Sequence, residues 1–179
     1  MSHANRDEVV RYVLVARDKI EPAMKVLSFV LLLCLAAVAY AQKYTGPRPA
    51  KPDLPYLKHA ENLVPTEASE AKEEKGKKDE ITYAIAGAAS TARTPLASPI
   101  FLLQSEKLKA DALQLYRLEI RNGRREITAS PKKPMKAIRL EVTRLDTGLY
   151  RLEVTDSLEA GEYSLTPEGS NQVFCFQVH

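Results

Sequence analysis

The stretch Leu115-Tyr-Arg-Leu-Glu-Ile-Arg-Asn-Gly-Arg-Arg-Glu-Ile127 contains two short runs of alternating apolar and charged residues, one on each side of Asn122-Gly123. Alternation with a period of two is typical of an antiparallel strand that turns one face to a core and the other to water. Asn-Gly is a strong signal for a two-residue hairpin, because a type I′ turn needs positive φ at both positions. The stretch therefore predicts a β-hairpin.

The same alternation returns on both sides of this hairpin. It is clear in Ile138-Arg-Leu-Glu-Val142 and again in Tyr150-Arg-Leu-Glu-Val154, and Asp146-Thr-Gly148 between them predicts another turn. Ser105 to Leu113 carries helix formers after a serine, which is compatible with a single helical turn. In total the pattern predicts eight strands, at residues 81–87, 99–104, 113–121, 124–129, 136–144, 149–155, 161–166 and 172–178.

Strands at this spacing predict an all-β domain over residues 81–179, an antiparallel sandwich of two packed sheets. Within it, Leu158-Glu-Ala-Gly161-Glu-Tyr163 resembles the tyrosine corner of immunoglobulin-like sandwiches. In that motif the phenol bonds to nearby backbone and fixes the crossing between the sheets. We therefore expect an immunoglobulin-like β-sandwich of seven to eight strands, with Leu158, Gly161, Tyr163, Asn122 and Gly123 in structural roles.

The closing half of the chain is similar to uncharacterised exported bacterial domains with an immunoglobulin-like β-sandwich. The resemblance spans residues 113–178 and depends on Leu115-Tyr-Arg-Leu-Glu-Ile, Arg125-Glu-Ile, Gly161-Glu-Tyr-Ser-Leu and Val173-Phe-Cys-Phe-Gln-Val. It implies the fold and an exported location, and it implies no activity.

Residues 24–41 have the pattern of a secretory signal peptide. Lys25 precedes an apolar run that ends in Ala39-Tyr-Ala41, the small-x-small pattern that signal peptidase reads. We expect cleavage before Gln42 and an exported protein, periplasmic or extracellular. Residues 1–23 are too long and too acidic for an ordinary n-region, and we interpret them as a misannotated extension before a true start at Met24.

An uncleaved membrane anchor is the alternative interpretation of the same apolar run. Residues 26–41 would then stay in the bilayer, and the protein would be membrane-anchored. The run is shorter than the roughly 20 apolar residues that a bilayer core needs. We therefore favour the cleaved signal.

Residues 42–80 differ in composition from the rest. Four prolines fall between residues 43 and 57, and residues 66–80 are rich in Lys and Glu without a large apolar side chain. Such a stretch buries too little surface to offset the entropy lost on ordering. The composition predicts a disordered linker, after which the folded domain begins at Ile81.

Charge and cysteine content exclude several classes of protein. The formal net charge of +3 is too small for a nucleic-acid-binding protein, which would carry a strong basic excess. Apart from Cys34 in the predicted signal, Cys175 is the one cysteine, so no intrachain disulfide is expected in the mature chain.

The sequence contains one weak candidate for a catalytic pair. Cys175 and His179 fall on one face of the last predicted strand, and a thiol with an imidazole could form a nucleophile–base pair. A buried core cysteine and a frayed terminal histidine explain the same residues better. No metal-ligand spacing and no phosphate-binding loop occurs. We expect no enzyme activity, no cofactor and no metal.

A weak candidate for an anionic partner is a group of basic residues on predicted loops. Glutamates are interspersed among them, so a solvated face with cross-strand ion pairs explains the composition better. The group consists of Arg121, Arg124, Arg125, Lys132, Lys133 and Lys136.

The sequence thus predicts a non-catalytic module with a binding or structural role in the bacterial cell envelope. The partner would be an envelope protein or polymer, and a homo-oligomer is compatible with the pattern. A second hypothesis is an assembly subunit in which residues 42–86 donate an extended strand to a partner. A third is a small-ligand carrier or an enzyme.

Overall fold

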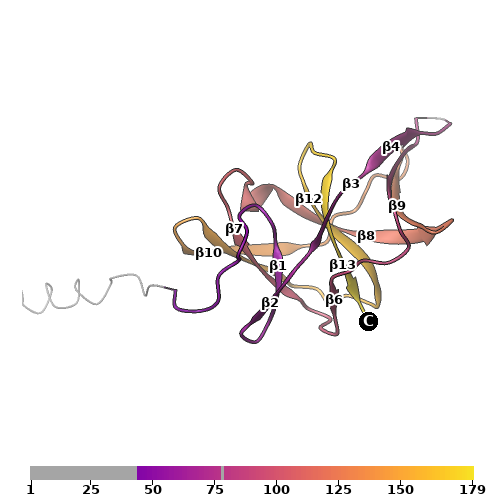
Figure 1. The fold of residues 1–179 in the computed structure, drawn as a ribbon. Coiled ribbons are helices and arrows are strands. Elements are labelled where there is room, and N and C mark those ends of the chain that lie inside the picture. The colour runs from indigo at the N-terminus through magenta and orange to yellow at the C-terminus, as the bar shows by residue number, and fades with distance from the viewer. Residues whose placement is uncertain (1–43, 78) are drawn as a thin grey trace, which may run out of the picture. The chain divides into compact units, whose positions relative to one another are not determined.

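The computed structural model describes residues 44–77 and 79–179, an all-β domain of two sheets (Figure 1). The predicted signal peptide at 24–41 and the extension at 1–23 lie outside the described residues. Residues 43–179 form one compact unit. Within the described part, thirteen strands pair antiparallel, except for β6, which runs parallel to β13.

The smaller sheet has five strands in the order β10-β11-β7-β1-β2. Their bounds are β1 Tyr56–His59, β2 Asn62–Pro65, β7 Ile100–Gln104, β10 Leu140–Asp146 and β11 Leu149–Val154.

The larger sheet has the order β3-β13-β12-β8-β9-β5-β4, with β6 beside β13. A 3-10 helix, η1 (Ala110–Ala112), leads into β8. The strand bounds are β3 Glu67–Glu70, β4 Lys72–Lys75, β5 Ile81–Ile85, β6 Arg93–Thr94, β8 Leu113–Arg121, β9 Arg124–Ala129, β12 Gly161–Pro167 and β13 Gln172–Val178.

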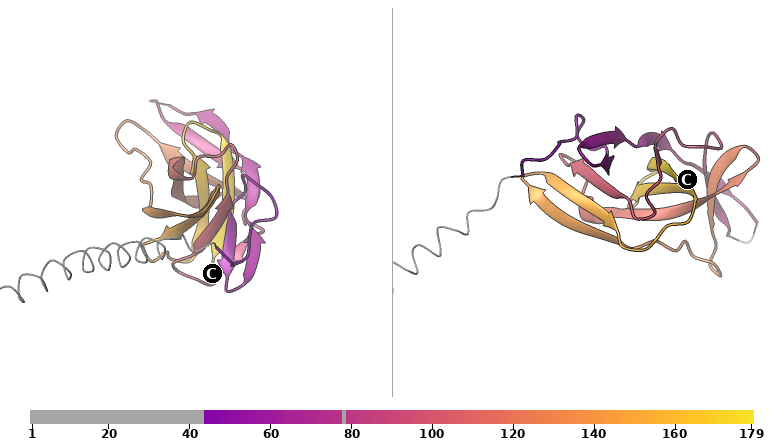
Figure 2. Two further views of the ribbon diagram at one scale, coloured as in Figure 1. Left: turned by 90° about the vertical axis from the view of Figure 1, so that its left-hand side faces the viewer. Right: turned by 90° about the horizontal axis from the view of Figure 1, so that it is seen from below.

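The main core lies between the two sheets, which form separate layers in Figure 2. Phe101 of β7 meets Phe176 of β13 edge to face, with ring centroids 5.0 Å apart. The ring of Tyr163 of β12 stacks on Phe176 at 5.5 Å, and its hydroxyl donates a hydrogen bond of 2.8 Å to the Glu159 carbonyl. That bond ties the ring to the backbone just before β12.

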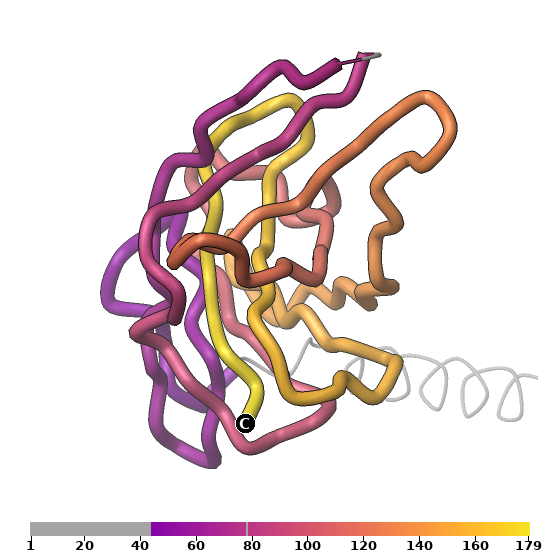
Figure 3. The backbone as a smooth tube through the Cα atoms, turned by 90° about the vertical axis from the view of Figure 1, so that its right-hand side faces the viewer, coloured from indigo at the N-terminus to yellow at the C-terminus, as the bar shows by residue number. Residues whose placement is uncertain are grey.

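The larger sheet curls into a half-barrel because its path begins and ends on one stretch of chain. β3 pairs with β13 and β4 pairs with β5, yet only Ala71 separates β3 from β4. We call residues 67–75 the bridging segment; Figure 3 shows this part of the chain beside the yellow C-terminal hairpin. Inside the half-barrel lies a second apolar cluster, made of Ala71, Ile85, Leu118, Val173 and Cys175.

The predicted all-β class is confirmed, and the predicted strands 113–121, 124–129 and 172–178 have the observed bounds of β8, β9 and β13. Between the first two, Asn122 and Gly123 have φ of 50° and 73°, as a type I′ turn requires. The structure adds five strands, β1–β4 and β6, that the alternation did not predict.

The prediction of a disordered linker over 42–80 is wrong for the described part of that segment, which contains β1–β4 and belongs to the same compact unit as the rest. The bridging segment is held by main-chain ladders to β13 and β5, and not by large apolar side chains. Two of its carboxylates pair with arginines of β9: Glu67 with Arg125, and Glu74 with Arg124. The interactions that order this segment come from strands that are distant in the sequence, so the local composition could not predict them.

The segment that precedes β1 is fastened by Asp53. Its carboxylate accepts hydrogen bonds of 2.8–2.9 Å from the backbone N–H groups of Glu106, Lys107 and Leu108. Burial disfavours the charged form, but these donors outweigh it and hold the pKa of Asp53 below its usual value. The contact joins the start of the domain to the loop after β7.

We expect Asp53→Ala to lower the free energy of unfolding by about 2 kcal/mol, since the variant loses this acceptor and must adopt a left-handed backbone, φ 56°, without a polar side chain. Asp53→Asn tolerates that conformation and should cost less than half as much. Urea unfolding at pH 7 measures both. The stabilisation by Asp53 should be complete above about pH 4, the pKa of the unfolded chain's carboxyl, and should be lost as the pH falls through the lower pKa of the folded state. Equal losses in the two variants would contradict this role.

Candidate functional site

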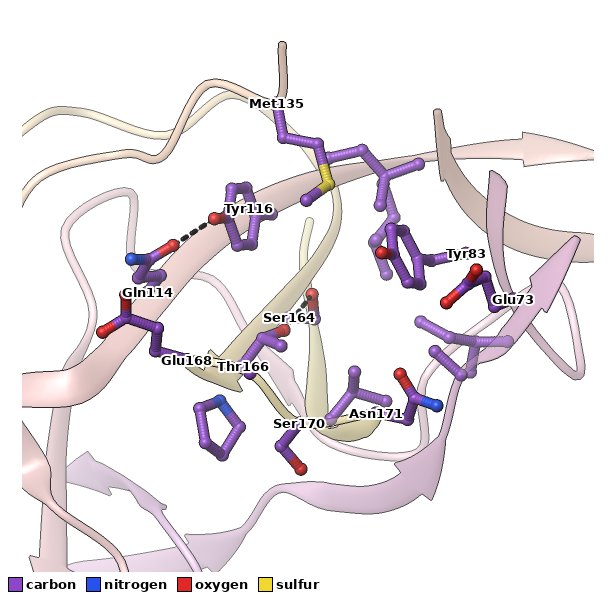
Figure 4. Close-up of a pocket in the computed structure, with 17 residues that line it drawn as sticks. Glu73, Tyr83, Gln114, Tyr116, Met135, Ser164, Thr166, Glu168, Ser170 and Asn171 are labelled. Atoms are coloured by element: carbon purple, nitrogen blue, oxygen red, sulfur yellow. Dashed lines mark hydrogen bonds between the residues drawn. The ribbon is translucent and has the colours of Figure 1, made fainter. Parts of the chain in front are cut away.

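The half-barrel encloses a pocket of about 400 Å³, shown in Figure 4. Strands β5, β8, β9, β12 and β13 supply its walls, together with the β12–β13 turn and part of the bridging segment. The pocket lies on the face of β8, β12 and β13 that points away from the main core. It is thus a second interior, distinct from the space between the sheets.

The inner end of the pocket is apolar, and its walls are aromatic. Ile85, Leu118 and Val173 line it from the second cluster. Tyr83 and Tyr116 stand on opposite sides, and the thioether of Met135 points in between them (Figure 4). Such a surface favours a ligand with an apolar body.

The polar groups of the pocket are mainly neutral. The Tyr116 hydroxyl donates to the side-chain oxygen of Gln114, and the hydroxyls of Ser164 and Thr166 are 3.3 Å apart. Burial raises the pKa of Tyr116, and the negative charge of Glu168 raises it further. At neutral pH the phenol therefore remains a protonated donor.

The rim carries two carboxylates. Glu73, from the bridging segment, stands beside Tyr83, and Glu168, from the β12–β13 turn, stands beside Gln114 on the other side (Figure 4). Among the described residues that line the pocket there is no lysine, arginine or histidine. The charge at the rim is therefore negative.

A buried ionic cluster lies around Arg125 of β9, a strand of the pocket wall. The side chain of Arg125 is 1% exposed and lies two residues from Ile127 of the pocket wall. Its guanidinium donates to the Gly87 and Ala86 carbonyls at 3.0 and 2.7 Å, to the Ser90 hydroxyl at 2.7 Å and to the Glu67 carboxylate at 2.5 Å. The cluster thus joins β9, the bridging segment and the loop after β5.

A second carboxylate completes the cluster. Glu162 of β12 is fully buried; its Oε2 accepts hydrogen bonds from the backbone N–H and the hydroxyl of Ser90 and lies 3.9 Å from the Arg125 guanidinium. Its Oε1 has no hydrogen-bond partner among the described residues. Burial acts against the charged form of Glu67, but the hydrogen bond from Arg125 and that from the Thr91 N–H lower its pKa overall.

Cys175 lies beside this cluster, between Glu67 and Ser164 on the neighbouring strands. Its side chain is buried, and burial raises the pKa of the thiol to about 12. His179 follows the end of β13, and its exposed position is fixed by a backbone bond to the Thr94 carbonyl. The structure therefore does not bring the two residues together, and the thiol has the opposite of an activated environment.

The predicted basic patch is not a single surface. Arg125 was expected on a loop, but it is buried in the half-barrel, because two glutamates and two carbonyls satisfy its charge there. Arg121 pairs with Glu119, and Arg124 pairs with Glu74. Lys132, Lys133 and Lys136 remain exposed on the loop after β9.

No protein-family model, curated protein or solved structure matches this chain. Within residues 44–77 and 79–179, no helix is long and apolar enough to cross a membrane. In the same residues, no group of three or more His, Cys, Asp or Glu side chains is placed to hold a metal ion.

Period-two alternation did not predict the pocket, because that pattern implies one core face for each strand. On β8, Leu113 and Leu115 face the main core, whereas Tyr116 and Leu118 face the half-barrel. Ile120, expected inside, is 57% exposed. The adjacent apolar residues Leu115 and Tyr116 were the signal in the sequence that both faces of β8 are buried. A strand with one face in water would carry a polar residue at one of these two positions.

Proposed function

We propose that this chain is an exported, non-catalytic binding module of the cell envelope, and that its half-barrel pocket holds a small organic ligand. The observation that carries the proposal is the pocket itself. Its aromatic and aliphatic walls enclose about 400 Å³ that the side chains of the chain leave unfilled. That volume falls in the range of known small-molecule sites.

Strand order supports an immunoglobulin-like sandwich as the scaffold. The sequence β10-β11-β7-β1 corresponds to strands D-E-B-A of that fold, and β13-β12-β8-β9 corresponds to G-F-C-C′. Tyr163 then lies at the start of strand F, where the tyrosine corner belongs. On this interpretation the segment from β2 to β6 is an insertion between strands A and B; β2 extends the smaller sheet beside strand A, and β3 to β5 complete the curled larger sheet.

Two observations favour binding without chemistry, and a third supports the exported location. Ser164, Thr166 and Gln114 bring neutral polar groups that fix a ligand without exchanging protons at neutral pH. The Cys175 thiol is protonated and buried behind the pocket. The signal-like pattern of residues 24–41 supports export.

The assembly hypothesis receives less support from the described residues. It needs residues 42–86 to pair with another molecule, whereas the five strands in that range all pair within this chain. A small-ligand carrier is therefore the alternative that the geometry favours.

The test is an NMR screen of small organic fragments against the full chain and two variants. Thr166→Phe places a ring in the pocket, and Thr143→Phe places the same ring on an exposed position of β10. We expect hits that shift Tyr83 and Tyr116 resonances, that raise stability by about 1.4 kcal/mol at ten times their Kd, and that are lost in Thr166→Phe alone. A screen without such hits, or hits unaffected by Thr166→Phe in a folded variant, would refute the proposal.

A further inference from the structure

We infer that the ligand of the pocket is a small organic cation, an amine or quaternary ammonium group on an apolar body. This inference rests on the proposed function and adds the charge of the ligand to it. It comes from three features that converge on the same space: the sign of the rim, the aromatic walls and the apolar inner end.

The negative charge at the rim of the pocket disfavours an anionic ligand. Glu73 and Glu168 stand on opposite sides of the opening, and no basic side chain lines the pocket within the described residues. An anionic ligand would have to enter between two like charges, which costs affinity. A cation would be attracted from both sides.

The walls suit a cation better than a neutral polar group. The ring faces of tyrosines carry negative charge density and attract ammonium groups, most of all where water is excluded. Tyr83 and Tyr116 flank the space, and the polarizable thioether of Met135 lies over it. The raised pKa of Tyr116, caused by burial and by Glu168, agrees with a negative local field.

The inner end explains why an apolar body is needed. Ile85, Leu118 and Val173 present only hydrocarbon there. The buried charge of Arg125, two residues from Ile127 of the pocket wall, is paired with Glu67 and lies 3.9 Å from Glu162. A ligand would therefore place its hydrocarbon part against these side chains and its charge between the tyrosines and the rim.

Three probes with one hexyl chain test the inference: hexylammonium, hexanol and heptanoate. Titration of the isotope-labelled full chain by NMR reports binding at Tyr83, Tyr116 and residues 164–173, and so separates the pocket from other apolar segments. We expect hexylammonium to bind about tenfold more tightly than heptanoate and several-fold more tightly than hexanol, from two rim charges and two ring faces.

The outcomes separate the inference from the proposed function. Equal affinity for the three probes, or a preference for heptanoate, would overturn the cation and leave the binding pocket standing. Failure of every probe to shift pocket resonances would count against both.

Two double variants test whether the rim carboxylates cause the preference for a cation. Glu73→Gln/Glu168→Gln should reduce the ratio of hexylammonium to hexanol affinity to near one. Glu106→Gln/Glu141→Gln removes the same charge from exposed positions outside the pocket lining and should leave the ratio unchanged. A ratio that survives in the first variant would overturn recognition by the rim carboxylates.

Discussion

Replacement of Arg125 by methionine is expected to lower the free energy of unfolding by about 3–5 kcal/mol. Methionine fills a similar length but leaves Glu67 and Glu162 without their cation, and it removes the donors to the Gly87 and Ala86 carbonyls. An uncompensated charge that stays buried is the costly part of this change. Urea unfolding at pH 7, followed by circular dichroism, measures the loss.

The adjacent residue provides a matched control. Arg124 is about one-third exposed and pairs with Glu74 and Glu126 on the outside of the same strand. Exposed pairs contribute little, so Arg124→Met should destabilise the chain far less than Arg125→Met does. Adding Glu162→Gln to Arg125→Met should recover part of the loss, because it removes one of the two orphaned charges. Similar losses in Arg124→Met and Arg125→Met would show that the cluster does not stabilise the half-barrel.

Cys175 is expected to react with iodoacetamide about a thousandfold more slowly in the folded chain than in the unfolded chain at pH 8. The thiolate is the reactive form, and a pKa of about 12 leaves far less of it than the usual value near 9 does. Mass spectrometry of the peptide that contains residue 175 measures this rate separately from that of Cys34. Modification at the unfolded rate under native conditions would contradict a sealed interior.

The same thiol should make stability depend on alkaline pH. The folded state keeps its proton to higher pH than the unfolded state does, so the stabilisation is complete below about pH 9 and is lost as the pH rises toward 12. We expect a loss of about 1.3 kcal/mol between pH 8 and pH 10 from this group. In Cys175→Ala, the loss of unfolding free energy between pH 8 and pH 10 should be smaller by this amount.

Alternation along the chain predicted eight of the nine strands from Ile81 onward, all but β6, because each of the eight has at least one face in an apolar interior. It could not predict β3 and β4, whose alternate residues are mostly Lys, Glu and Ser. Those strands form because β13 and β5 offer unpaired main-chain groups and β9 offers arginines. Such partners lie far away along the chain, and no local pattern contains them.

The residues of the candidate site were likewise predicted only in part. Tyr116 and Leu118 were predicted to be buried, and they are. That they face a hollow instead of the main core depends on the bridging segment, which composition assigned to disorder. Arg125 was misplaced for a related reason: a charged residue beside a turn is normally exposed, and the two glutamates that bury it lie 58 positions before it and 37 after it.

The bridging segment also sets the order in which the molecule can fold. Residues 67–70 pair with residues 172–175, so nearly the whole domain must be synthesised before that contact can form. Pairing across so long a loop is slow, because the chain loses conformational entropy on closing the loop before the strand contacts stabilise it. The hairpins β8–β9 and β12–β13 can form early, whereas the hollow beside them is completed last. A chain that stops before Gln172 would keep several hairpins and would lack the pocket of the half-barrel.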